Sequence, residues 1–308
     1  MISKKILMIG NSFSISVGWN LPDIVREAGH SLKLVSAYIG GCPLSRHVEN
    51  LERAGQDPDF RPYDYRIWTI RNGRTVMSEP EKAGLDAFLK DDLYDIVTIQ
   101  QASHFSWDWN TYQPFAGQLI DGIRAAQPQA EIVVQQTWAY RIQDPRLEGE
   151  WGFGQEGMFR RLDEAYRKLA DAYGFRRIPT GTAVQISRER TPEQERFRRI
   201  SPEEKASFRW PDLPPQAGDV VGAMSWHRTA EGRLAIGEDN IHLNKRGEYL
   251  QACVWFGALF GEDPRLIRWT PGFLSDADAA FLRECAYEAL VREGLFHPET
   301  GGNHSCNS

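Results

Sequence analysis

The chain has 308 residues, of which 41% are hydrophobic and 25% are charged, and its formal net charge is −6 at pH 7. These values are ordinary for a globular protein that can bury a sizeable core, and the net charge gives no general attraction to nucleic acid or to an anionic membrane. No stretch approaches the roughly eighteen apolar residues that a membrane helix needs, so we expect no membrane span.

Strand and helix patterns alternate over the first two-thirds of the chain. Unbroken apolar runs predict buried strands, and apolar residues at helical spacing predict helices. In chain order we expect a strand at 5–9, a helix at 21–29, strands at 32–38 and 95–100 with a helix at 80–90 between them, a helix at 111–127, a strand at 131–136, a helix at 158–173, a strand at 176–180, and closing helices at 246–260 and 276–292. This alternation predicts an α/β fold with a mostly parallel sheet that is covered on both faces.

Two insertions interrupt the alternation, at about 46–79 and 187–236. The first contains Asn72-Gly73, a pair typical of a two-residue hairpin turn. The second is charged and contains prolines without clear periodicity, so we expect it to be functional or partly disordered. Because no linker is visible, we predict a single domain over residues 1–308 with a loose C-terminal tail.

The four cysteines show no metal-binding spacing, and we expect free thiols at Cys42, Cys253, Cys285 and Cys306. The N-terminus has two lysines and then only a short apolar run before Gly10, which is too short for a signal-peptide core. The protein is therefore expected to be cytoplasmic, or to be secreted with its signal peptide absent from this sequence.

Small and polar residues follow the predicted strands, where ligands bind in a doubly wound sheet. Ser12 follows the first strand, the pair Gly40-Gly41 follows the second, and the pair Gln100-Gln101 ends the third. The fourth strand is followed by Trp138 and Tyr140. These residues are expected to meet at one edge of the sheet.

A late segment, Asp239-Asn240-Ile241-His242, supplies groups that can activate a serine. A serine hydroxyl is a weak nucleophile that needs an adjacent base, and the base needs an orienting group. His242 can be that base and Asp239 its orienting group, because their separation of three positions lets both side chains face the same way. Taken singly, Ser12 could also be a helix cap and Gly40-Gly41 a simple turn.

Four segments occur in order along the chain: IGNSFS, IGGCPLSRH, IVTIQQAS and DNIHLN. They resemble the four blocks of the SGNH/GDSL hydrolases, and especially the DUF4886 branch, over residues 5 to about 260. The resemblance implies a three-layer α/β/α sandwich with a parallel, flavodoxin-like sheet. It also implies ester hydrolysis through an acyl-serine, with Ser12 as nucleophile and Asp239 and His242 as the remaining catalytic pair. The sequence has no HExxH motif and no acidic pattern that would hold a metal, so no metal or cofactor is expected.

The oxyanion hole is the part of the site where the sequence departs from the family. The backbone N–H groups of Ser12 and of Gly41, or alternatively Gly40, are expected to be two of its donors. The first block reads Gly-Asn-Ser in place of Gly-Asp-Ser, and the third lacks the usual Gly-x-Asn-Asp. We predict that the side-chain amide of Gln101 replaces the missing asparagine, with Gln100 as the alternate.

Aromatic residues are frequent in the loops at the same predicted edge. We expect Trp107, Trp138 and Tyr140 to contact substrate, and Trp109, Trp151 and Trp226 share this kind of placement. Exposed aromatic rings can stack on sugars, whose C–H faces are apolar. The predicted function is a serine esterase that hydrolyses short acyl esters. Acetyl is the preferred acyl group, and an O-acetylated carbohydrate is the expected substrate. The alternatives are a lipase- or thioesterase-like enzyme for longer acyl chains and a non-catalytic carbohydrate-binding protein. No nucleic-acid or membrane partner is expected.

Overall fold

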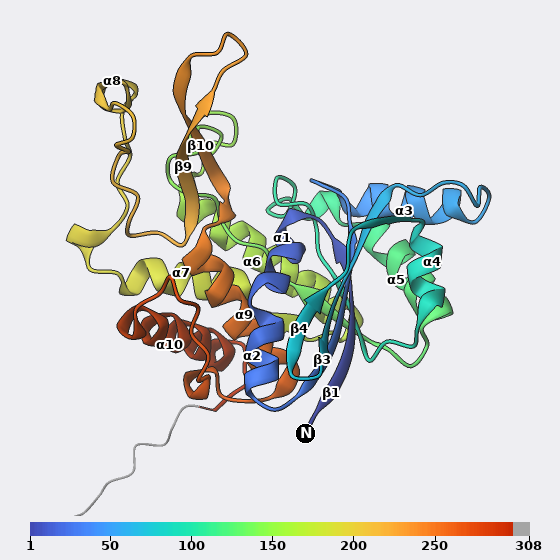
Figure 1. Ribbon diagram of the computed structural model, residues 1–308. Coiled ribbons are helices and arrows are strands. Elements are labelled where there is room, and N and C mark those ends of the chain that lie inside the picture. Colours follow the sequence, from blue (N-terminus) through green and yellow to red (C-terminus); the bar gives the residue numbers. More distant parts are fainter. Residues whose placement is uncertain (298–308) are drawn as a thin grey trace, which may run out of the picture.

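A sheet of eight strands lies at the centre of the protein in the computed structural model, which describes residues 1–297 (Figure 1). Along the sheet the strands follow the order β4-β3-β2-β1-β6-β7-β8, and β5 pairs with β3. Their bounds are β1 Ser3–Gly10, β2 Ser31–Tyr38, β3 Tyr63–Arg71, β4 Arg74–Met77, β5 Glu81–Ala83, β6 Ile96–Ile99, β7 Glu131–Gln135 and β8 Arg177–Ile178.

Five of these strands form a parallel core. β1 pairs in parallel with β2 and β6, β6 with β7, and β7 with β8. Numbered among themselves, the parallel strands have the order 2-1-3-4-5, which is the flavodoxin-like arrangement. The strand order reverses direction between β1 and β6, so the carboxyl end of β1 lies at the switch point where such sheets bind ligands.

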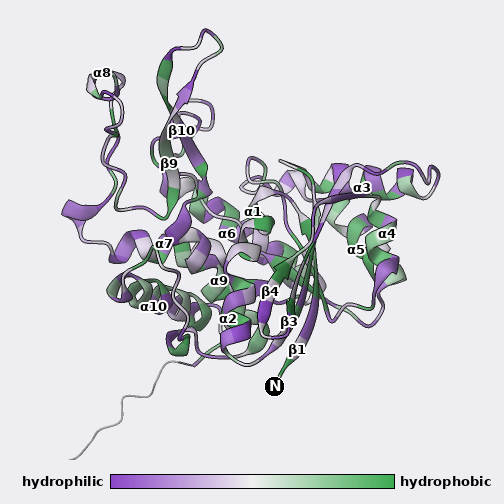
Figure 2. Ribbon diagram, in the orientation of Figure 1, coloured by the Kyte–Doolittle hydropathy of each residue, from purple (hydrophilic) through white to green (hydrophobic). Residues whose placement is uncertain are grey.

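Helices cover both faces of this sheet, and the predicted three-layer α/β/α sandwich is confirmed. The helices are α1 Ser12–Ile15, α2 Leu21–Glu27, α3 Leu44–Ala54, α4 Leu85–Asp91, α5 Phe115–Ala126, α6 Gly154–Tyr173, α7 Thr180–Arg190, α8 Pro202–Ser207, α9 Lys245–Phe260 and α10 Asp276–Arg292. One layer contains α3, α4 and α5, while α2, α7 and α9 pack together on the other side with α10 outside them (Figure 1). The hydrophobic residues gather on the central strands between these layers (Figure 2).

The run Ile6–Gly10 of β1 is buried along its whole length because helices cover both of its faces. Three cysteines of residues 1–297, namely Cys42, Cys253 and Cys285, are free and buried, while Cys306 lies outside the described residues. Burial raises the pKa of the Cys42 thiol to about 12; the charge of Arg46 opposes this rise and that of Glu49 adds to it, so this thiol stays protonated. No helix among the described residues is long and apolar enough to cross a membrane.

The first insertion extends the sheet. β3 runs antiparallel to β2, and Arg71 of β3 pairs with Arg74 of β4 across the predicted two-residue turn. Asn72 and Gly73 have φ values of 52° and 70°, as a type I′ hairpin turn requires. The helix expected at 80–90 begins only at Leu85, because residues 81–83 pair with β3 as strand β5.

The second insertion contains α8 and the strand β9 (Val221–Arg228), which pairs with β10 (Leu234–Leu243). The β9–β10 hairpin and the α8 segment both project from the body of the protein (Figure 1). The segment with Asp239 and His242 is the end of β10. The C-terminal tail predicted as loose lies in residues 298–308, outside the described residues.

Candidate active site

Ser12 is the first residue of α1, directly beyond the carboxyl end of β1. The last residue of the strand, Gly10, has to be a glycine, because a Cβ atom at this position would lie 2.5 Å from the Ser14 hydroxyl oxygen. Asn11 then caps α1, and its side-chain oxygen accepts a hydrogen bond from the Phe13 N–H at 3.0 Å. This tight turn from strand to helix holds Ser12 at the switch point of the sheet.

The structure brings Ser12, His242 and Asp239 together in one line. The Ser12 Oγ lies 2.8 Å from His242 Nε2, and His242 Nδ1 lies 2.8 Å from Asp239 Oδ2. The other carboxylate oxygen, Oδ1, accepts the backbone N–H groups of Ile241 and His242, each at 3.0 Å. A nucleophile, a base and an orienting carboxylate are thus placed as acyl transfer to serine requires.

The charge of Asp239 fixes the hydrogen-bond directions in this line. Its partial burial raises the pKa of the carboxyl, but hydrogen bonds from the His242 ring and from the His242 and Ile241 N–H groups outweigh burial and lower the pKa to about 2. An ionised carboxylate only accepts hydrogen bonds, so His242 Nδ1 is the donor to Asp239. The Nε2 atom of the neutral ring is therefore the acceptor, and it faces the hydroxyl of Ser12.

The side chains of His242 and Asp239 are partly open to solvent. The side chain of His242 is 40% exposed and that of Asp239 is 42% exposed. Both side chains can therefore be reached from solvent.

Asn11 connects the three blocks that surround Ser12. Its amide nitrogen donates to the Cys42 carbonyl at 3.2 Å, and its amide oxygen accepts from Gln100 Nε2 at 2.7 Å as well as from the Phe13 N–H. A carboxylate could accept the same two bonds, but it could not donate to Cys42. The asparagine that distinguishes this chain from a Gly-Asp-Ser sequence therefore has a specific partner.

The Gly40-Gly41 turn is well shaped to present backbone donors. Cys42 N–H donates to the Ile39 carbonyl at 3.3 Å, which closes a tight turn with both glycines exposed at its tip. Gly41 has a φ of +60°, a left-handed conformation that glycine adopts without steric cost. Within the described chain, the N–H groups of Ser12, Gly40 and Gly41 have no backbone or side-chain acceptor.

The expectation that Gln101 supplies an oxyanion donor does not agree with the structure. The Gln101 amide nitrogen donates to the carbonyl and hydroxyl of Thr111, at 2.9 and 3.1 Å, which occupies both of its hydrogens. Its oxygen accepts from the Leu44 and Ala102 N–H groups. The alternate, Gln100, donates to Asn11, so neither glutamine amide is directed at the Ser12 hydroxyl.

Trp138 and Tyr140, expected to contact substrate, belong to the core. They are 0% and 1% exposed, because the segment after β7 is covered by the end of β10 and by the loop after β6. The Tyr140 hydroxyl lies 2.8 Å from the Ser103 hydroxyl. Trp107 is partly exposed and packs against Trp151 and Phe153, so it alone of the three retains a surface for a ligand.

Two buried glutamines that sequence reasoning missed hold the residue after Ser12. Gln135 of β7 and Gln251 of α9 both donate to the Phe13 carbonyl, at 2.6 and 2.9 Å. Gln251 in turn accepts from the Ser16 hydroxyl at 2.7 Å. A polar residue at the end of an otherwise apolar strand was the available signal for Gln135, whereas nothing in the local pattern distinguishes Gln251.

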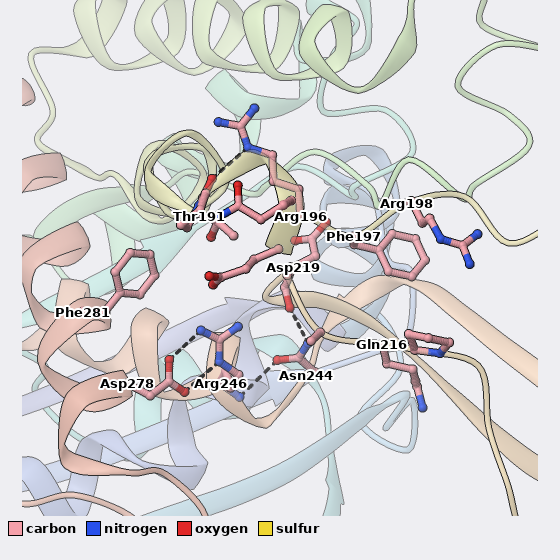
Figure 3. Close-up of a pocket in the computed structure, with 16 residues that line it drawn as sticks. Thr191, Arg196, Phe197, Arg198, Gln216, Asp219, Asn244, Arg246, Asp278 and Phe281 are labelled. Atoms are coloured by element: carbon pink, nitrogen blue, oxygen red, sulfur yellow. Dashed lines mark hydrogen bonds and ion pairs between the residues drawn. The ribbon is translucent and has the colours of Figure 1, made fainter.

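A hollow with a volume of about 620 Å³ lies beside the start of α9 and includes neither Ser12 nor His242 (Figure 3). Asn244, in its wall, accepts the N–H groups of Arg246 and Gly247 and so caps α9. Arg246 pairs with Asp278 at 2.6 Å. These contacts fix the beginning of the helix that follows His242. Residues 1–297 contain no cluster of three or more His, Cys, Asp or Glu side chains that could hold a metal ion.

A family model described as "Domain of unknown function (DUF4886)" matches residues 5–201. The chain belongs to the DUF4886 family. The predicted membership is thus confirmed, although Asp239 and His242 lie beyond the matched residues and their place in the site rests on the geometry. A search of curated proteins found no match.

Solved structures with a similar fold include a DUF4886 family protein from Bacteroides uniformis, with a TM-score of 0.72 and 24% identity over 94% of this chain and 95% of that one. A protein from Slackia heliotrinireducens described as an SGNH hydrolase has a TM-score of 0.49 and 18% identity, over 83% of this chain and 99% of the other. One from Parabacteroides merdae described as a GDSL-like lipase has a TM-score of 0.46 and 13% identity, over 85% and 99%. At these identities the likeness concerns the fold.

Proposed function

We propose that this DUF4886 protein is a serine ester hydrolase. The observation that carries the proposal is the continuous line from Ser12 through His242 to Asp239, with a distance of 2.8 Å at each step. The nucleophile and the base are 230 positions apart in the chain, so local structure alone does not account for their meeting. A structural hydroxyl has no need of a base that a carboxylate orients.

The proposed reaction has two steps. The Ser12 Oγ attacks the acyl carbonyl while its proton moves to His242 Nε2, and the tetrahedral intermediate expels the alcohol, which takes the proton from His242. Water then attacks the acyl-serine with His242 as base, and the carboxylic acid leaves Ser12 with its proton restored. The N–H groups of Ser12 and of Gly41 or Gly40 would stabilise the negative oxygen in both steps.

We propose that the substrates are esters of short acyl groups, with acetyl as the preferred group. The open position of His242 and Asp239 supports this choice, because it suits a small acyl group attached to a large alcohol that remains partly in solvent. An O-acetylated carbohydrate is the proposed alcohol part. The partly exposed ring of Trp107, on the loop after β6, supports sugar stacking.

The test is hydrolysis of p-nitrophenyl esters by the full chain, together with labelling by an active-site phosphonate. We expect the wild type to hydrolyse the acetate ester and Ser12 to carry the label in mass spectrometry. Ser12→Ala should abolish both, whereas Ser45→Ala, a partly exposed serine of α3, should keep both. A label on another residue, with Ser12→Ala fully active, would contradict the proposed nucleophile.

The acyl group and the alcohol are tested separately. A series from acetate to octanoate should show the highest kcat/KM for the shortest acyl chain, and acetylated sugars should release acetate. A maximum at eight carbons would replace the proposal by a lipase- or thioesterase-like activity. Binding of sugars without any ester hydrolysis or serine labelling would favour the non-catalytic reading.

A further inference from the structure

Trp138 lies between the segment that carries Ser12 and the segment that carries His242. Its ring stacks on Phe13, with the centroids 4.1 Å apart and the planes inclined by 15°. Its indole Nε1 donates a hydrogen bond of 2.8 Å to the carbonyl of Ile241. Phe13 directly follows Ser12, and Ile241 directly precedes His242. One rigid, fully buried side chain thus contacts the neighbours of both reacting groups.

The chain around His242 lacks the support that a strand usually has. β10 pairs with β9 up to Asp239 and again at Leu243, with a shift of register between them. Residues 240–242 therefore have no partners in β9. Two consecutive carbonyls there are held from the segment after β7: Arg141 N–H donates to the Asn240 carbonyl at 2.8 Å, and Trp138 donates to that of Ile241.

Phe13, on which Trp138 stacks, is firmly fixed. The Phe13 carbonyl accepts hydrogen bonds from two buried glutamines, and the Phe13 N–H donates to the side-chain oxygen of Asn11. Phe13 itself is 1% exposed. Because Phe13 is held in place, the stacked contact also holds the ring of Trp138 in place. The indole N–H of Trp138 in turn holds the carbonyl of Ile241.

We propose that Trp138 is a positioning residue that sets the distance between Ser12 Oγ and His242 Nε2. The inference rests on the proposed function of the Ser12–His242 pair, but it concerns how that pair is held. Trp138 is fully buried and makes no contact with substrate, so its loss should lower turnover and leave KM unchanged.

The test is Trp138→Phe, which keeps a buried ring next to Phe13 and removes the donor to Ile241. Trp255→Phe is the matched control: Trp255 of α9 is also fully buried, but within the described chain its indole nitrogen has no partner. On p-nitrophenyl acetate, well below both melting temperatures, we expect kcat of Trp138→Phe to fall about tenfold, the scale of one displaced buried hydrogen bond. KM should stay within about twofold, and both kinetic constants of Trp255→Phe should do so too.

A readout independent of hydrolysis separates this inference from the proposed function. In protein labelled with ¹⁵N-histidine, the ring signals of His242 should shift in Trp138→Phe and remain in place in Trp255→Phe. If the wild type is inactive and unlabelled by phosphonate while this shift is present, the proposed function fails and the positioning role stands. An active wild type whose kcat and His242 signals are unchanged in Trp138→Phe would overturn the positioning role.

A second variant covers the case in which Trp138→Phe does not fold. Phe13→Leu removes the stacked ring and leaves the indole donor in place. It should lower kcat about three- to tenfold with KM unchanged, since it weakens both the stacking that holds Trp138 and the direct contact of Phe13 with the His242 ring, whose centroid lies 5.7 Å away. A wild-type kcat in folded Phe13→Leu would equally contradict the coupling.

Discussion

Replacing Asn11 by aspartate changes one nitrogen atom to oxygen beside the proposed nucleophile. Both bonds that the Asn11 oxygen accepts, from Phe13 N–H and Gln100 Nε2, can persist in the variant. The bond from Asn11 Nδ2 to the Cys42 carbonyl is lost, and two acceptors then face each other across 3.2 Å. Because Asn11 is 1% exposed, water cannot replace the missing donor.

The magnitude follows from the lost donor. A buried carbonyl left without a partner costs about 1–3 kcal/mol, and we take about 2 kcal/mol for this site. In a protein of a few hundred residues, 1 kcal/mol corresponds to about 2–4 °C in Tm, so the Tm should fall by about 4–8 °C. The same bond ties the Gly40–Cys42 turn to Ser12. If that turn presents an oxyanion donor, its displacement should lower kcat about tenfold, less than the 100- to 1000-fold of a donor removed outright.

The assay combines thermal unfolding with kcat and KM on p-nitrophenyl acetate. Asn50→Asp is the control, because Asn50 is also buried but donates at 3.4 Å to the Tyr63 hydroxyl, which lies 2.8 Å from His47 Nδ1, and not to the Cys42 carbonyl. It should leave kcat unchanged. The Gly-Asp-Ser sequence of the wider SGNH group suggests the opposite result, namely that aspartate is harmless. A wild-type Tm and kcat for Asn11→Asp would refute the role assigned to the Cys42 contact.

Three further outcomes are expected. Asp239→Asn should lower kcat at all pH values. The folded pKa of Asp239 is about 2, so the ionised carboxylate stabilises the native state above its unfolded pKa near 4 and loses that contribution as the pH falls towards 2. The Tm of Asp239→Asn should therefore depend less on pH between about 4 and 2 than the Tm of the wild type. An identical dependence would contradict the hydrogen bonds from His242 and Ile241 to Asp239. Gln101→Ala should lower the Tm by several degrees through its lost bonds to Thr111, while kcat falls less than about fivefold; a 100-fold loss in kcat would restore Gln101 as an oxyanion donor. Gly73→Ala should cost about 1 kcal/mol of unfolding free energy at unchanged kcat, because Gly73 has a φ of 70°, and chemical denaturation that shows no loss would contradict the assigned turn.

The sequence by itself determined those features that depend on neighbouring residues. An apolar run followed by glycine and serine defined β1 and the place of Ser12, since burial on both faces leaves no alternation. Asn72-Gly73 defined a hairpin turn, because few residue pairs adopt positive φ twice. The three-position spacing of Asp239 and His242 made their side-chain contact possible. The order of such local signals was enough to predict the parallel α/β/α architecture.

Only the tertiary structure decided where side chains beyond the strand ends point. Strand periodicity ends with the strand, so the pattern could not show that Gln101 turns towards Thr111 or that Trp138 turns inward to Phe13. Both directions depend on segments that arrive later in the chain. In the case of Trp138, the acceptor is the carbonyl of Ile241, 103 positions away, at a break in the β9–β10 ladder that no local sequence signal marks.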